Sequence, residues 1–277
     1  MIQNGPKFKH DPRRLVDCLF SRAKRWLILV NLSRACSVLL GITSAFLFST
    51  WTLTPVVVFM LYVLSEVATW RSEAFKRSAE TVLRKLDFWD SFAWEISSEE
   101  MSDFVIDCPS RLRKKIPPPA ADDYFASREE PGPTRALENL QESAWWTKHL
   151  ARRMGHILLF ITIAVTIASM IVLLAGIGAL QNQETLGNVG RTVTAALMLV
   201  LSLGLARLTL AYYQLGKRAE QSEREASRQL KSTTTLLDVV KAWHDYQVAR
   251  AGAPLIPNSL WRLKRSELNE AWKNYRI

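Results

Sequence analysis

The sequence predicts an all-α integral membrane protein with four transmembrane helices, arranged as two hairpins, and a helical cytoplasmic domain. The first observation behind this prediction is that residues 35–65 and 157–183 contain no charged side chain, while residues 192–216 contain only Arg207. The second is that 48% of the residues are hydrophobic and 22% are charged, yet the two kinds are segregated along the chain. A spanning helix needs about 20 apolar residues, and soluble cores rarely require such runs.

The first hairpin is predicted from residues 26–50 and 54–70. A turn at 51–55 separates these helices, and Pro55 fits the first turn of the second one. The hydrophobic run continues into a second span and the basic head extends to Arg25. The chain is therefore not expected to begin with a cleavable signal peptide.

The second hairpin is predicted from residues 156–180 and 191–216. At about 1.5 Å per residue, the helix over 156–180 is long enough to cross the hydrocarbon core with some tilt. The loop between the two helices, 181–190, is short, and Gly187 and Gly190 are its predicted turn residues.

Basic residues indicate the orientation of these spans. The formal net charge is +10, and the cations gather at four of the eight span ends. They include Arg22, Lys24 and Arg25 before the first span, Arg71, Lys76 and Arg77 after the second, Lys148, Arg152 and Arg153 before the third, and Lys217, Arg218 and Arg224 after the fourth. At the two turns predicted on the outer side, within the hairpins, the only basic residue is Arg191. This pattern predicts a multi-pass membrane protein with both termini in the cytoplasm, and it accounts for the basic charge without binding to a nucleic-acid polymer.

The chain thus divides into five predicted segments, and helices are expected to continue beyond the membrane. Helical spacing of apolar residues continues through 70–89, 135–154 and 217–249, and a last amphipathic helix is predicted over 258–275. The segments are a basic cytoplasmic head (1–25), transmembrane hairpin 1 (26–70), a cytoplasmic helical insert (71–155), transmembrane hairpin 2 (156–216) and a cytoplasmic helical tail (217–277).

Motifs for metal binding and catalysis are missing from the sequence. The three cysteines, Cys18, Cys36 and Cys108, lie far apart, and the four histidines form no ligand spacing. No GxSxG, Walker, HExxH or GxGxxG motif occurs. The sequence therefore predicts neither a metal site, nor a cofactor, nor an enzyme.

The spans contain two kinds of candidate functional residue. Small residues recur every four positions in the first span, at Ser33, Ser37, Gly41, Ala45 and Ser49. Such spacing lets helix backbones approach closely, either inside one protomer, between protomers or around a pore. The spans also carry Arg34 and Arg207, which either extend to the lipid headgroups or face a polar path; Glu66 could pair with either arginine.

The insert contains an aromatic and polar stretch, residues 138–149, with two adjacent tryptophans. On a helix, Asn139, Glu142 and Trp146 share one face, and Trp145 belongs to the other. This stretch is either an interfacial aromatic belt or a ligand site in which a tryptophan stacks on a base and polar groups recognise its edge. A nearby basic cluster, which could meet phosphates or lipid, consists of Arg111, Arg113, Lys114 and Lys115.

The whole layout resembles the S-4TM family of pore-forming effectors, which are found beside cyclic-oligonucleotide synthases in bacterial anti-phage (CBASS-type) defence. The resemblance covers nearly the full chain. It is carried by Ala23–Lys24–Arg25 before the first hairpin, by the acidic aromatic stretch from Leu86 to Trp94, and by the stretch from Glu138 to Trp146. Where the family has Leu-Pro-Trp, this chain has Phe92–Ala93–Trp94.

The resemblance implies an effector that a cyclic oligonucleotide or a partner signal activates through the cytoplasmic domain. The active form would be a homo-oligomer that permeabilises the inner membrane and causes growth arrest or death, as in abortive infection. The residues leave two other classes open: a membrane-anchored scaffold, for which Arg34 and Arg207 would be dispensable, and a small channel or transporter with flux but no toxicity.

Overall fold

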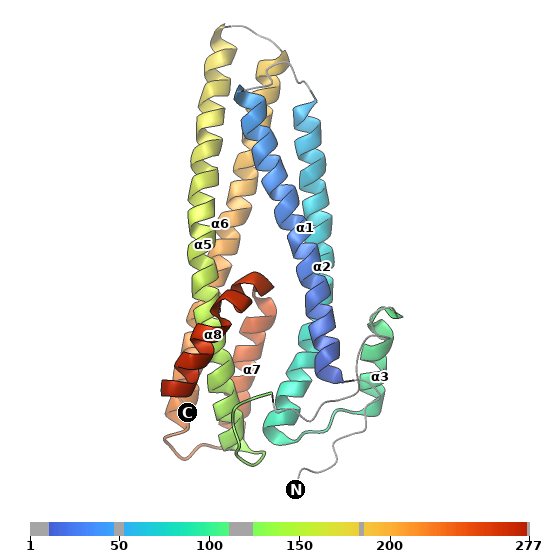
Figure 1. Ribbon diagram of the computed structural model, residues 1–277, viewed down its shortest axis with the longest axis vertical. Helices are drawn as coiled ribbons and strands as arrows, with labels where there is room; N and C mark the ends of the chain where they lie inside the picture. The colour runs from blue at the N-terminus through green and yellow to red at the C-terminus, as the bar shows by residue number, and fades with distance from the viewer. Residues whose placement is uncertain (1–10, 47–52, 111–123, 183–185, 276–277) are drawn as a thin grey trace. The chain divides into compact units, whose positions relative to one another are not determined.

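The computed structural model describes residues 11–46, 53–110, 124–182 and 186–275. These residues form seven α-helices and no strand, which confirms the predicted all-α class (Figure 1). The helices are α1 (Pro12–Phe46), α2 (Thr54–Phe92), α3 (Ser98–Asp107), α5 (Pro133–Asn182), α6 (Leu186–Gln229), α7 (Leu236–Gly252) and α8 (Asn258–Tyr275).

The chain folds into two compact units. Unit 1 comprises residues 1–24, 73–152 and 214–277, and unit 2 comprises residues 25–72 and 153–213. Unit 1 therefore contains the first turns of α1, the second half of α2, the first part of α5, the end of α6 and all of α3, α7 and α8. Unit 2 consists of the apolar segments of α1, α2, α5 and α6.

Unit 2 has an apolar exterior. Most of the large hydrophobic side chains that are exposed belong to it, among them Leu39, Phe59, Met60, Phe160 and Leu174. Its buried side chains are mostly small, and more than half of them carry a hydroxyl group. This is the reverse of the distribution in a water-soluble domain, where exposed apolar patches are limited to a few hundred Å².

One helical segment among the described residues, Pro133–Ile171, is long and apolar enough to cross a membrane by length and composition. Only 22% of its most apolar 18-residue stretch is buried, whereas the core helix of a soluble protein is mostly buried. By this criterion the described chain has one candidate span rather than the four expected from the sequence.

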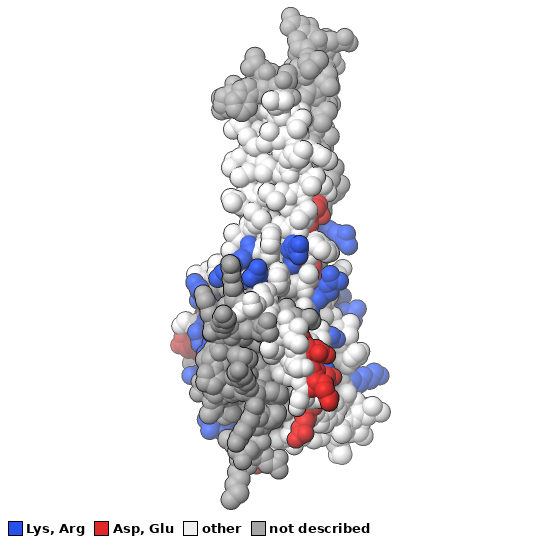
Figure 2. Space-filling view, turned by 90° about the vertical axis from the view of Figure 1, so that its right-hand side faces the viewer, with Lys and Arg blue, Asp and Glu red and all other residues white. Residues whose placement is uncertain are grey.

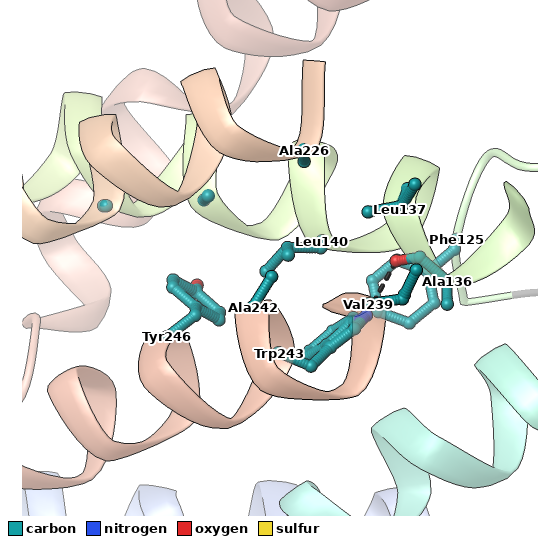
Figure 3. Packing of buried hydrophobic residues seen from close by; sticks show 11 residues of the cluster. Phe125, Ala136, Leu137, Leu140, Ala226, Val239, Ala242, Trp243 and Tyr246 are labelled. Carbon is teal, nitrogen blue, oxygen red and sulfur yellow. Dashed lines mark hydrogen bonds between the residues drawn. The ribbon is translucent and has the colours of Figure 1, made fainter. Parts of the chain in front are cut away.

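The larger core of unit 1 forms where α5, α6 and α7 meet (Figure 3). At its centre the indole of Trp243 is 0% exposed and donates from Nε1 to the carbonyl oxygen of Ala136 at 2.7 Å. Leu140 of α5 and Ala226 of α6 pack around it, and Phe125 closes one end. A second core joins α1, α2 and α3 through Leu15, Leu19, Val82, Leu86 and Met101.

Opposite charges fix the antiparallel register of α5 and α6 in unit 1. Lys148 bonds Glu223 at 2.5 Å and Arg152 bonds Glu220 at 2.7 Å. Gly216 lets α6 pack closely against α5, because a Cβ at this position would lie 3.1 Å from the Cγ of Arg152.

Helix α2 ends at a left-handed residue. Ala93 has a φ of 55°, and its N–H donates to the carbonyl oxygen of Trp89 at 2.8 Å. Glycine is usual at this position because a Cβ is strained there. Proline, whose φ is fixed near −65°, does not fit it.

Two expectations about helix ends were wrong. Gly187 and Gly190 were predicted as turn residues, but α6 begins at Leu186 and includes both. The stripe predicted through 217–249 is two helices, since α6 ends at Gln229 and Thr235 caps α7 with its hydroxyl on the N–H of Asp238. The Thr235 hydroxyl accepts a hydrogen bond from a backbone N–H that has no partner within the helix, and this N-cap favours a new helix start after α6. Predictions for the last helix, 258–275, are confirmed.

Candidate ligand pocket of unit 1

The end of α7 is held against α2 by buried charges. Arg250 donates to Glu80 at 3.1 Å and to Asp87 at 2.9 Å. One turn before Glu80, Lys76 donates to the carbonyl oxygen of Ala251 at 2.8 Å and also to that of Ala253. A cation at the last carbonyl groups of a helix satisfies acceptors that have no partner within the helix.

The charge state of Arg250 follows from these contacts. Burial alone would lower its pKa, but the carboxylates of Asp87 and Glu80 together raise the pKa well above its ordinary value. Arg250 is therefore a permanent cation whose charge is balanced by two buried acids.

A pocket of about 500 Å³ lies beside this network, entirely within unit 1. The volume is in the range of sites for small molecules and cofactors. Segments far apart in the sequence contribute side chains to it. They are Phe20 and Lys24 of α1, Glu80 and Leu83 of α2, Tyr124 and Phe125, Glu142, Ser143, Trp146, Thr147 and Leu150 of α5, Leu215 of α6, Tyr246 and Arg250 of α7, Ala253, Pro254, Leu255 and Ile256, and Trp261, Arg265 and Asn269 of α8.

Three cations reach the pocket from three helices. Lys24 donates to the amide oxygen of Asn258 at 2.5 Å, and burial lowers its pKa. The guanidinium of Arg265 lies 4.8 Å from the ring centroid of Trp261. Arg250 is the third. These groups come from α1, α7 and α8, so an anion in the pocket could bridge all three helices.

The two acids of the pocket oppose these cations only weakly. Glu80 is already paired with Arg250. Glu142 accepts a hydrogen bond from the N–H of Ala126 at 3.0 Å, and burial raises the pKa of its carboxyl group. Since Glu80 and Asp87 balance the charge of Arg250, the positive charge that favours an anionic ligand comes from Lys24 and Arg265.

Aromatic side chains provide the flat surfaces of the pocket. Trp146 and Trp261 line it together with Tyr124. Tyr246 lies at one side, where its hydroxyl group donates to the carbonyl oxygen of Ser143 at 3.0 Å and contacts the hydroxyl of Thr147 at 2.8 Å. Indole rings beside cations are the combination that binds a nucleobase and its phosphates.

The structure brings together two of the ligand residues expected from the sequence. Trp146 and Glu142 both line the pocket. Trp145 instead lies in the interior, 5.2 Å from the ring of Trp272 and 4.7 Å from that of His149. Asn139 is fully buried and donates to the hydroxyl of Ser91 at 3.2 Å.

The predicted basic cluster of Arg111, Arg113, Lys114 and Lys115 lies outside the described residues. Sequence reasoning missed Lys24, Arg250, Arg265 and Trp261. Their residue types are suitable for anion binding, but no spacing along the chain connects them.

The candidate residues of the spans lie in unit 2. Arg34 and Glu66 form an ion pair at 3.8 Å, one of the two pairings considered from the sequence, and Arg207 is exposed. Ser33, Ser37 and Gly41 are all buried, as helix packing requires. The side chain of Ala45 lies outside the described residues. Within the described part of the chain, no three His, Cys, Asp or Glu side chains are grouped as metal ligands.

Comparisons of the chain with protein-family models, with curated proteins and with solved structures find no match.

Proposed function

We propose that this chain is a ligand-gated effector that permeabilises the inner membrane of bacteria during antiviral defence. Unit 1 is the cytoplasmic sensor and binds a cyclic oligonucleotide or a partner signal. Unit 2 crosses the membrane four times, with both termini in the cytoplasm. Activation favours an oligomer that leaks, which leads to growth arrest or death.

The pocket of unit 1 is the observation that carries this proposal. Lys24 and Arg265 supply positive charge next to the indoles of Trp146 and Trp261, and the paired guanidinium of Arg250 lies beside them. To shift the ratio of active to resting protein from 1:99 to 99:1, a ligand must bind the active state more tightly by about 5.5 kcal/mol. Several charge-assisted contacts of about 1.5–3 kcal/mol each, with one stacked base, are sufficient for this switch.

The surface of unit 2 supports the membrane part of the proposal. Figure 2 shows a broad uncharged surface over the helices of unit 2, whereas charged side chains gather over unit 1. Large apolar side chains are exposed on each of α1, α2 and α5. Burial of these side chains in hydrocarbon stabilises each by about 1.5–3 kcal/mol.

Binding tests the sensor. Purified full-length protein in detergent is titrated calorimetrically with cyclic dinucleotides and cyclic trinucleotides. We expect Arg265→Gln to weaken binding at least tenfold, since one charge-assisted contact is lost. The matched control is Arg262→Gln, because Arg262 is also an exposed arginine of α8 but does not line the pocket. Equal affinities of the two variants would contradict the assignment.

Membrane potential tests the effector. The chain is expressed in bacterial cells together with a cyclic-oligonucleotide synthase, and a potential-sensitive dye is recorded. We expect depolarisation and arrested growth with the active synthase and neither with a catalytically inactive one. Full potential and normal growth in both cultures would contradict the proposal.

A further inference from the structure

The interior of unit 2 is rich in hydroxyl groups. All four helices of the unit bury at least one such side chain: Ser33 and Ser37 on α1, Ser65 on α2, Thr162 and Ser169 on α5, and Thr209 on α6. In a bundle surrounded by lipid, small residues allow close packing. Alanine and glycine would serve that purpose without a polar atom, so packing alone does not explain the hydroxyl groups.

Most of these hydroxyls bond within their own helix. Ser37 donates to the carbonyl oxygen of Ser33 at 2.9 Å, Thr162 to that of Leu158 at 2.7 Å, and Ser169 to that of Val165 at 2.7 Å. A hydroxyl group has one donor and two acceptor lone pairs. Each oxygen can therefore accept a bond from water without loss of the bond to its own helix.

One contact between helices and one unpaired hydroxyl group distinguish the interior further. The hydroxyl oxygens of Thr162 and Thr209 lie 3.2 Å apart and join α5 to α6. Ser65 is 0% exposed, and its Oγ has no hydrogen-bond partner among the residues that the structure describes. An unpaired buried hydroxyl group costs about 1–3 kcal/mol, and a water molecule would remove that cost.

Two of these hydroxyl-bearing residues are followed by a charged one. Glu66 follows Ser65 and pairs at 3.8 Å with Arg34, which follows Ser33. The Arg34 side chain is 19% exposed and that of Glu66 is 51% exposed, so the arginine is the more buried member of the pair. Charged side chains in spanning helices usually face the bundle interior or a water-filled path.

We infer that the conduction path of the active protein runs along the hydroxyl-lined interior of unit 2 within each protomer, rather than between protomers or through disturbed lipid. This inference rests on the proposed function. In the resting state the hydroxyls bond to their own helices and the path is closed. Separation of the four helices by the width of a water molecule lets water reach these hydroxyl groups, while the apolar exterior stays in lipid.

Cysteine accessibility tests the path. Cys18, Cys36 and Cys108 are first replaced by serine or alanine, and single cysteines are introduced as Ser37→Cys and Ser169→Cys in the interior. The matched controls on the same two helices, Leu39→Cys and Ile167→Cys, are at exposed apolar positions. Each full-length variant is reconstituted in liposomes, potassium leak is started with cyclic dinucleotides or trinucleotides, and a charged methanethiosulfonate is added. Helical content and melting temperature exclude misfolded variants, and a second interior position, Thr162→Cys, replaces any that fails.

We expect the reagent to reduce the leak at least fivefold in the interior variants and by less than a factor of two in the controls. Block at Leu39→Cys or Ile167→Cys alone would place the path between protomers and overturn the inference. A leak that no cysteine blocks would indicate a lipid lesion and overturn it too. Failure of the cysteine-free and natural proteins to leak at all would contradict the proposed function itself, and this inference with it.

Discussion

The two units of this protein distribute polar groups in opposite ways. In unit 1 the interior contains large apolar side chains such as Trp243 and Leu140, and its buried charges are paired. In unit 2 the large apolar side chains lie outside and serine and threonine lie inside. Burial of apolar side chains away from water explains the interior of unit 1. Under the proposed function, lipid covers the apolar exterior of unit 2, so the comparison teaches how one chain can suit two solvents, and the experiments below test this contrast.

The largest effect is expected at the buried charges of unit 1. Arg250→Leu leaves the carboxylates of Glu80 and Asp87 buried without their partner, which costs about 3–5 kcal/mol of stability. Thermal unfolding of the detergent-solubilised protein measures this loss. The control is Arg224→Leu, which removes a solvent-exposed pair with Glu220 and should change the melting temperature much less. Similar melting temperatures for the two variants would show that the buried network contributes little.

The same substitution in the two units should have unequal effects. Leu39 in unit 2 is 62% exposed and Leu237 in unit 1 is 75% exposed. Leu39→Lys near the middle of a span costs about 2.5–3.5 kcal/mol of insertion free energy. Leu237→Lys at a water-exposed site stays within about 0.5 kcal/mol. The amount of protein in the membrane fraction and the melting temperature measure both effects, and a harmless Leu39→Lys would refute the lipid-facing surface.

A smaller effect of the opposite sign is expected at the end of α2. Ala93→Gly relieves the strain of a φ of 55° and stabilises the protein by about 0.5–1 kcal/mol, since the gain exceeds the entropy that glycine adds to the unfolded chain. Ala74→Gly, in the interior of the same helix, should instead destabilise by about 1 kcal/mol. Melting curves of both variants compare the two, and destabilisation by Ala93→Gly would contradict the left-handed cap.

The smallest effect is expected in the pH dependence of stability, through Glu142. Burial raises the pKa of Glu142 above its ordinary value of 4.5, so the folded protein keeps a proton there that the unfolded chain has lost. This stabilisation is present at acid pH and is lost as pH rises through the raised pKa. We therefore expect Glu142→Gln to melt above the natural protein at neutral pH and equally below about pH 4.5. It should also bind a cyclic oligonucleotide more tightly at neutral pH, since a carboxylate leaves the pocket.

Glu138→Gln is the control for this pH dependence. Glu138 precedes Glu142 by one turn and accepts a hydrogen bond from Ser127, outside the pocket lining. Its variant should follow the pH profile of the natural protein. If the melting temperature of Glu142→Gln depended on pH as that of the natural protein does, the Glu142 carboxyl group would not be the source of this pH dependence.

The sequence predicted the helices well wherever apolar spacing was long and regular, as in α2 and α5. The break between α6 and α7 was missed because Leu230 and Leu237 continue one stripe across it. The run Ser232–Thr235 was the available signal, since these side chains compete with the helical backbone.

The pocket could be predicted only where its residues share one helix. Trp146 and Glu142 are four positions apart and point to the same site. Trp145 directly precedes Trp146 on the helix and faces the core instead. Lys24, Arg250 and Arg265 meet only through the packing of α1, α7 and α8, which local periodicity does not encode.

The two ion pairs between α5 and α6 give these helices a discrete set of alignments. A shear of one helical turn, about 5.4 Å, would bring Arg152 to Glu223 and would leave Lys148 opposite Ser227. That arrangement recovers one of the two pairs and releases Glu220. Ion pairs therefore form at shifts of whole helical turns and are lost in between. Axial sliding of α6 past α5 in unit 1 is expected to occur in steps of one turn.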